Sequence, residues 1–203
     1  MIANITKLIN DIEFGNLFDA FEAAKEIANE TLSKKDIGIL ARVAFNGNEV
    51  HNMESATYAL SSIENGDSAL SILINLLSTS DIHESVRGQA AEGIGIIRPL
   101  YKNRHRRLAE STLFNCLNDP SPVVRFWSCY AVGQLKMKKA LPILKILKAN
   151  DHEICPDWWY ISEEAEDAIE WINGRDGKDR IPVNQRKTTE PAASQGPRGP
   201  RGL

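Results

Sequence analysis

The sequence predicts an all-α protein in which about five pairs of helices stack into a right-handed superhelix. Three observations support this prediction. Apolar residues recur at helical spacing, as at Ile5, Leu8, Ile9 and Ile12, and alternating strand patterns are absent. Turn signals divide the chain into about ten segments of helical length. Finally, similar helices recur in the same order along the chain.

Capping and turn residues justify the individual helices. The Asn46-Gly47 and Asn173-Gly174 pairs each follow an apolar helical run, where a left-handed residue can close the last turn. Ser121 offers a cap hydroxyl, and the proline that follows it suits the first helical position, where a missing N–H costs nothing. These signals predict helices that are joined by short turns.

An internal repeat groups the helices into pairs. Val86-Arg87 and the small or apolar residues after it recur 38 residues later, beginning at Val124-Arg125. Partial copies fit the same frame at residues 59–63 and 168–172. The partner helices repeat as well, since residues 69–73 and 140–144 have similar sequences. Periods of 34 to 38 residues indicate stacked helix pairs that share one elongated core.

The segment from Asp119 to Leu144 resembles a HEAT repeat of the short type first noted in phycobilin lyases. It reads Asp-Pro-Ser-Pro-Val-Val-Arg, then Tyr-Ala-Val-Gly-Gln-Leu, then Lys-Ala-Leu-Pro-Ile-Leu. The resemblance implies that Asp119 caps the following helix and that Arg125 pairs with an acidic group of a neighbouring repeat. Arg87 is the equivalent of Arg125 one repeat earlier. These are structural roles, because the HEAT motif specifies a fold and not a ligand.

We expect a repeat domain over residues 1–174 and a flexible tail over residues 175–203. The tail has almost no apolar periodicity, so it cannot bury enough surface to offset its ordering entropy. It carries seven Lys/Arg and three Asp/Glu, a net charge of +4, which leaves −7 on the body within the total of −3. An acidic body repels phosphate backbones, and this disfavours nucleic acid as the main ligand.

Cysteine usage and motifs indicate a cytoplasmic protein without a cofactor. Cys116, Cys129 and Cys155 are widely spaced, which favours free thiols in a reducing compartment. No apolar stretch approaches the ~18 residues of a membrane span, and we predict no membrane association. The four histidines are scattered, and metal-site, phosphate-loop and nucleophile-elbow motifs are absent. We therefore expect no metal, no cofactor and no enzymatic activity.

The basic segment over residues 98–107 is the first candidate binding site. Insertions in solenoids map to loops on one face, often the binding face. Lys102, Arg104, Arg106 and Arg107 would hold acidic side chains or phosphates through charge-assisted hydrogen bonds. The alternative is a solvated turn without a ligand.

The aromatic insert over residues 154–160 is the second candidate. Trp158, Trp159 and Tyr160 are large amphipathic groups of the kind that anchor interfaces, and Asp157, which precedes them, is a further candidate for binding a partner. Alternatively, the tryptophans cap the end of the solenoid core, because a terminal repeat must hide its apolar face. Each repeat begins with a Val-Arg helix, and we expect the helix that follows it to form the concave surface. Lys145 and Lys148 lie on such a second helix and would then also face a partner.

These features favour a module that binds another protein, acting as an adaptor, a scaffold or an inhibitor. Small standalone HEAT-like proteins of bacteria include adaptors and immunity proteins that sequester a toxin, and the acidic body suits a basic partner. Two alternatives stay open. The resemblance to phycobilin lyases implies a tetrapyrrole-handling lyase or chaperone. A resemblance to HEAT-like alkylpurine DNA glycosylases, which combine a basic concave face with Trp and Asp, implies DNA repair, and the acidic body opposes it.

Overall fold

The computed structural model describes residues 4–63, 66–97 and 104–186. This part of the chain contains ten α-helices, two short 3-10 helices and no strand, so the all-α prediction is confirmed. None of its helices is both long enough and apolar enough to cross a bilayer. The α-helices are α1 (Ile5–Phe14), α2 (Leu17–Ile27), α3 (Lys34–Asn46), α4 (Val50–Ser61), α5 (Gly66–Ser78), α6 (Glu84–Ile96), α7 (Arg104–Cys116), α8 (Pro122–Gln134), α9 (Leu141–Asn150) and α10 (Ile161–Ile172).

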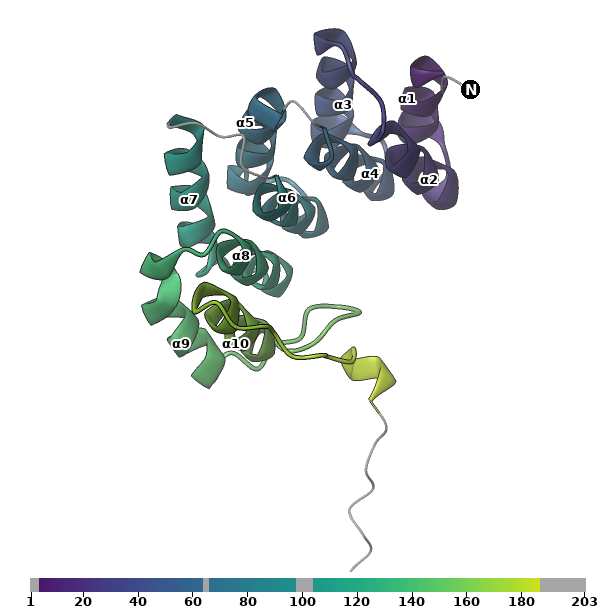
Figure 1. Ribbon diagram of the computed structural model, residues 1–203. Helices are drawn as coiled ribbons and strands as arrows, with labels where there is room; N and C mark the ends of the chain where they lie inside the picture. The colour runs from purple at the N-terminus through teal and green to yellow at the C-terminus, as the bar shows by residue number, and fades with distance from the viewer. Residues whose placement is uncertain (1–3, 64–65, 98–103, 187–203) are drawn as a thin grey trace, which may run out of the picture.

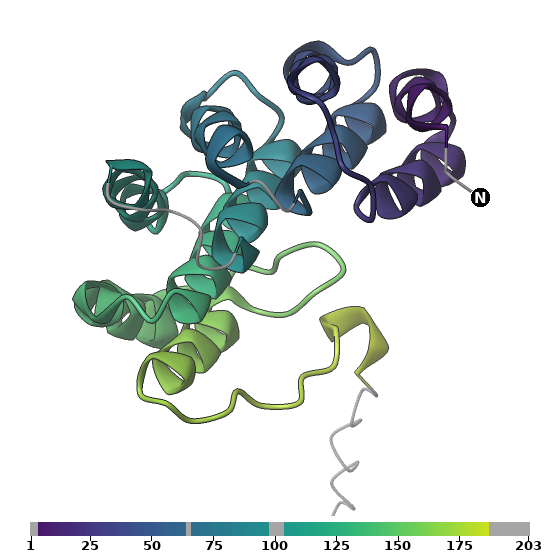
Figure 2. The same cartoon turned by 45° about the horizontal axis from the view of Figure 1, so that its top comes forward.

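The helices of the described residues form five successive pairs that stack along an arc (Figure 1). The even-numbered helices lie side by side on the inner side of the arc, and the odd-numbered helices form an outer row (Figures 1 and 2). Buried apolar residues from every pair join into one elongated core. The predicted stack of about five helix pairs is therefore confirmed.

Small residues let the inner helices approach one another closely. A Cβ atom added to Gly95 of α6 would lie 2.8 Å from the Cα of Ala131 on α8. One added to Gly133 of α8 would lie 2.9 Å from the Cα of Ala168 on α10. The distance between packed helices depends on the side chains at their contact. The small residues at these contacts therefore reduce the distance between neighbouring helices of the inner row. The stack bends toward the shorter row.

The position of this row corrects one expectation from the sequence. We expected the second helix of each pair, counted from the Val-Arg helix, to form the concave surface. That prediction was wrong, because α5 and α9 lie in the outer row (Figure 1). The Val-Arg helices α6 and α8 line the inner side instead, since they carry the glycines that permit close packing.

Arginines of the inner helices bind carboxylates of the following repeat. Arg87 of α6 is buried and pairs with Asp119, which precedes α8; its Nη1 lies 3.3 Å from Oδ1. One repeat later, Nε of Arg125 donates to Asp151 at 2.8 Å, and the same guanidinium pairs with Glu153. Because each of these ion pairs joins two successive repeats, the pairs stabilise the stacking order.

The cap of α8 is Ser121, not Asp119. The Ser121 side chain accepts from the backbone N–H of Val124, and the next residue, Pro122, starts the helix. Asp119 accepts from the backbone N–H of Ser121 at 3.0 Å while it binds Arg87. Asp119 therefore orients the turn before the helix and joins two repeats.

Residues 175–186, which we call the C-terminal strap, lie against α10. Nη2 of Arg180 binds Oδ1 of Asp167 at 2.9 Å and Glu166 at the same distance. We expected a flexible tail from residue 175, but these contacts fix its first part to the last helix. The prediction of flexibility considered only the low apolar content of the tail. Ion pairs with the carboxylates of α10 hold this part of the tail instead. Residues 187–203 lie outside the described residues.

Candidate functional site

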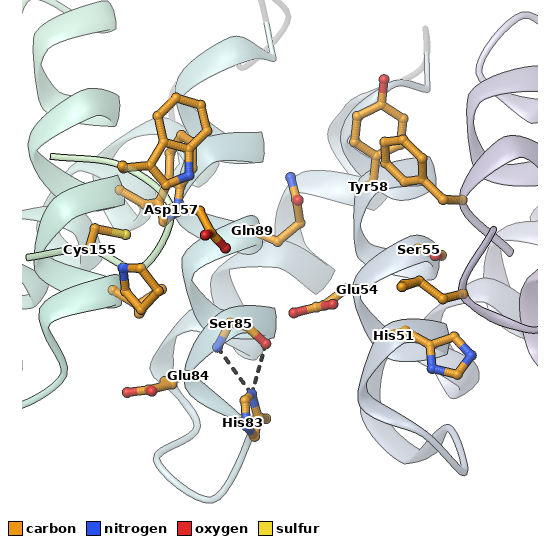
Figure 3. A pocket seen from close by; sticks show the side chains of 16 residues that line it. His51, Glu54, Ser55, Tyr58, His83, Glu84, Ser85, Gln89, Cys155 and Asp157 are labelled. Atoms are coloured by element: carbon orange, nitrogen blue, oxygen red, sulfur yellow. Dashed lines mark hydrogen bonds between the residues drawn. The ribbon is translucent and has the colours of Figure 1, made fainter. Parts of the chain in front are cut away.

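The inner helices and the α9–α10 connection form a groove of about 420 Å³ on the concave side of the arc (Figure 3). We call it the concave groove. Helices α2 and α4 provide one wall, and residues 155–158 of the connection provide the other. Side chains of α6 and α8 lie between the two walls.

The helical part of the lining comes from equivalent positions of successive repeats. Each of three inner helices contributes two residues at i and i+4, which lie on one helical face. The pairs are offset by the same 34 and 38 residues that relate the repeats. They are His51 and Ser55 on α4, Ser85 and Gln89 on α6, and Val123 and Trp127 on α8. The repeat thus determines which side chains reach the groove.

Exposed apolar side chains form the wall nearest the N-terminus. Phe21 of α2 is 46% exposed, and its ring centroid lies 5.6 Å from that of Tyr58 on α4. Leu17, one helical turn earlier, is 65% exposed. At the edge of this wall, Lys25 lies 5.5 Å from the Phe21 ring centroid and is paired with Glu22 at 2.9 Å. An apolar surface of this kind is unusual on a face without a partner.

The opposite wall is the aromatic loop, which we define as residues 151–160. A bridge between Ile154 and Tyr160 closes it, and its tip at Asp157 has a positive φ of 63°. Trp158 is 38% exposed and packs edge-on against Trp127 of α8, with ring centroids 5.2 Å apart. The loop therefore presents Asp157 and Trp158 to the groove.

A buried carboxyl group supports the loop from behind. The indole N–H of Trp159 donates to Oε2 of Glu164, at 2.9 Å. Burial raises the pKa of Glu164 to about 8, although the Trp159 hydrogen bond opposes the shift. Glu164 occupies in α10 the repeat position that Trp127 occupies in α8, 37 residues earlier. The aromatic loop covers Glu164, and Trp158 of the loop lines the groove in its place.

The groove is acidic. Its lining includes the carboxylates of Glu54, Glu84 and Asp157, and no lysine or arginine of the described residues lines it. Glu84 accepts from the hydroxyl of Ser121 at 2.6 Å. Figure 3 shows Glu54 and Asp157 pointing into the same space, with Gln89 beside them. A site with this charge favours cations and repels anions.

The two histidines of the lining are engaged with neighbouring groups. Nδ1 of His83 lies 2.8 Å from the hydroxyl of Ser85 and caps the start of α6. Nε2 of His51 lies 3.1 Å from the carbonyl oxygen of Gly15. Across the described ranges, no three His, Cys, Asp or Glu side chains are arranged to hold a metal ion.

The C-terminal strap also holds the aromatic loop. The backbone N–H of Val183 donates to the carbonyl oxygen of Trp158 at 2.9 Å. Arg186 binds Glu163 at 2.7 Å, and its guanidinium carbon lies 5.7 Å from the centroid of the Tyr160 ring. The position of Trp158 in the groove therefore depends on contacts made by the strap.

The predicted binding residues occupy three places. Asp157 and Trp158 line the concave groove, whereas Trp159 of the same loop is not part of the lining and contacts Phe126 and Glu164. Trp158 does not cover the end of the stack, because it packs on the concave side of α8. Lys145 and Lys148 lie on α9 in the outer row.

The basic segment is partly helical. Lys102 lies outside the described residues, and Arg104, Arg106 and Arg107 form the first turn of α7 in the outer row. Nε of Arg106 binds Glu110 one turn later at 2.7 Å. Arg106 and Arg107 are not among the residues that line the concave groove.

Sequence reasoning missed Phe21, Glu54, Tyr58 and Gln89. Each lies on an inner helix, and the wrong assignment of the concave row directed attention to the other helices. The signal was present in the repeat: Ser85 and Gln89 are polar, lie one turn apart on α6, and share the helix with many small or aliphatic residues. Such positions face solvent on a helix that is otherwise buried.

Comparison with known proteins agrees with this architecture. Residues 70–155 match the family model described as HEAT repeats. The described residues form an α-solenoid, and HEAT repeats are the family that residues 70–155 match. No curated protein matches the chain.

Three solved structures of designed or engineered proteins are similar to the chain. A designed armadillo repeat protein in complex with the peptide (KR)4 has 20% identity and a TM-score of 0.49, over 83% of this chain and 82% of that one. An engineered protein has 15% identity and a TM-score of 0.49, over 84% and 80% of the two chains. A computationally designed armadillo repeat protein for modular peptide recognition has 20% identity and a TM-score of 0.44, over 83% and 92%.

Proposed function

We propose that the protein is a binding module that holds a segment of another protein in the concave groove. The observation that carries this proposal is the convergence of exposed aromatic and acidic side chains, from four inner helices and the aromatic loop, on one groove. Aromatic anchors surrounded by polar groups are typical of protein interfaces. An elongated stack that leaves its concave face open suits an extended segment.

The role that fits this module is that of an adaptor, a scaffold or an inhibitor, including an immunity protein that masks a toxin. An inhibitor needs only to cover its partner, and a groove without a cation suits a basic target. The same charge opposes the DNA-repair alternative, although Asp157 and Trp158 lie in the groove. It therefore favours protein over nucleic acid as the partner.

The free thiols support binding in the cytoplasm rather than lyase chemistry. Cys116, Cys129 and Cys155 are free and buried. Cys155 lies in the groove lining, and burial raises the pKa of its thiol to about 12. A thiol with that pKa is a poor nucleophile at neutral pH, so the groove does not favour covalent attachment of a tetrapyrrole.

Photo-crosslinking from defined positions tests the proposal. A photoreactive amino acid replaces Gln89 in the groove or Lys145, an exposed residue of the outer row, in cells that express the full chain. We expect a stoichiometric protein adduct from position 89 that disappears when Phe21 and Trp158 are both replaced by alanine. An adduct from position 145 alone, or none from either position, would overturn the proposal.

A further inference from the structure

We propose that the occupant of the concave groove is a basic segment of the partner protein, with an arginine side chain held by Glu54 and Asp157 and stacked on the aromatic rings of the groove. This inference rests on the proposed function and names the chemistry of the occupant. Three features of the groove support it: its unpaired charge, its flat aromatic faces and its shape.

The charge of the groove lacks a counter-ion within the described residues. Glu54 lies on α4 and Asp157 at the tip of the aromatic loop, so the two carboxylates approach the same space from opposite walls (Figure 3). Neither takes part in a hydrogen bond or an ion pair with the described residues. Lys25, at the edge of the wall that Phe21 forms, is already paired with Glu22. A cation from outside the chain would compensate the charge of these carboxylates.

The aromatic rings favour arginine over lysine. Trp158 packs edge-on against Trp127 and is 38% exposed, so part of its ring is accessible to a ligand. Tyr58 and Phe21 lie on the facing wall. A planar guanidinium stacks on such rings and binds carboxylates through two parallel hydrogen bonds. An ammonium group is a compact, strongly hydrated charge and uses only the carboxylates well.

The shape of the groove fits a peptide rather than a lone side chain. Its volume of about 420 Å³ extends across helices from α2 to α8. Nε2 of Gln89 donates to Glu92 at 2.6 Å, so the Oε1 atom of Gln89 is available to accept from a backbone N–H. Polar contacts to the backbone beside a charged anchor are the usual way to hold an extended chain.

Matched synthetic peptides test this inference on the full-length protein. Three fluorescein-labelled peptides have glycine at alternate positions and arginine, lysine or citrulline between them. Citrulline has the shape of arginine without its charge. Fluorescence anisotropy should show the tightest binding for the arginine peptide, weaker binding for lysine, and a loss of about tenfold or more for citrulline. Equal binding of the arginine and citrulline peptides would overturn the inference.

Isosteric variants locate the contact. Glu54→Gln and Asp157→Asn remove one charge each without changing shape, and each should weaken the arginine peptide by about three- to tenfold while the citrulline peptide is unaffected. Glu26→Gln is the matched control, because Glu26 is an exposed carboxylate of α2 outside the groove lining. A loss in the control equal to that in the groove variants would mean that binding follows net charge alone, which overturns the assigned site.

A second measurement separates this inference from the proposed function. Three peptide libraries of equal length and equal apolar content carry net positive, zero or net negative charge, and the crosslinker at position 89 reports which of them enter the groove. Preference for the positive library supports both statements. Preference for the neutral or negative library overturns the basic occupant but leaves the binding module intact. Absence of adducts from all three overturns both.

Discussion

The indole N–H of Trp159 donates a hydrogen bond to the carboxyl group of Glu164, and the two atoms are 2.9 Å apart. Trp159 belongs to the aromatic loop, and Glu164, on α10, is almost completely buried. Its other oxygen, Oε1, has no partner in the described residues. A buried carboxyl group with one hydrogen bond is more stable protonated than ionised, and burial accordingly raises its pKa to about 8.

Replacing Glu164 with glutamine should therefore stabilise the protein at neutral pH. The folded chain keeps a proton on Glu164 up to about pH 8, whereas an unfolded glutamate loses its proton near pH ~4.3. Folding thus binds a proton between these values, and the contribution of Glu164 to stability falls as pH rises through that window. Glu164→Gln cannot ionise and accepts the Trp159 hydrogen bond. Urea unfolding at pH 7 should show a gain on the order of 2 kcal/mol.

The pH dependence provides the control for this variant. The stability difference between Glu164→Gln and the parent chain should be smallest near pH 5 and grow toward pH 8. Glu26→Gln, at an exposed position, should show no such trend. A difference that stays constant from pH 5 to pH 8 contradicts a carboxyl group that is protonated in the folded state.

Replacing Arg180 with methionine should destabilise the last repeat. The Arg180 side chain is 7% exposed and Asp167 is 3% exposed, so the variant leaves a buried carboxylate without its cation. Breaking a buried pair in this way costs about 3–5 kcal/mol. Urea unfolding measures the loss, and tryptophan fluorescence should change as well because the strap holds Trp158. Arg175→Met removes an exposed pair with Glu170 and should have little effect.

The close packing of the inner row makes a clear prediction for two glycines. Gly95→Ala places a Cβ atom 2.8 Å from the backbone of Ala131 and should destabilise by about 1–3 kcal/mol. Gly38→Ala in α3 meets nothing within 4 Å and should stabilise by about 0.5–1 kcal/mol through helix propensity. Thermal unfolding of both variants checks the prediction. Equal effects at the two sites would contradict the described spacing of α6 and α8.

The three cysteines should be nearly inert in the folded protein. Burial raises the pKa of Cys116 to about 11 and that of Cys155 to about 12, and it also raises the pKa of Cys129. Because the thiolate is the reactive form, Ellman's reagent at pH 8 should label native thiols slowly and label all three rapidly in urea. A thiol that reacts within seconds in the native protein would contradict its buried position.

The stacking of the helices could be predicted because it depends on short sequence patterns that recur in each repeat. The Val-Arg pairs at Val86 and Val124 mark equivalent helices, and the small residues after them mark where those helices meet. The concave row could not be assigned in this way, because curvature depends on the relative spacing of two rows of helices. A comparison of Gly95 and Gly133 with the leucines of the outer helices contains that information, since smaller side chains shorten a row.

The candidate site was predictable only in part. The aromatic insert marked Asp157 and Trp158, because three large aromatic residues in a connection are unusual. Their position against Trp127 depends on a loop that turns at a positive φ and on a backbone hydrogen bond from Val183, which is far away in the sequence. Contacts of this kind carry no periodic signal. The tail from residue 175 was predicted to be flexible because the ion pairs that hold its first part also leave no periodic pattern in the sequence.

The equivalence of Ser85 and Gln89 with Val123 and Trp127 has a consequence for any chain that lies across the helices. Neighbouring packed helices are about 8–10 Å apart, and an extended chain advances about 3.3 Å per residue. Each helix would then meet about every third residue of its ligand. A natural ligand should therefore show a three-residue rhythm in its own sequence, and sliding it by one position would move all of its anchors out of register together.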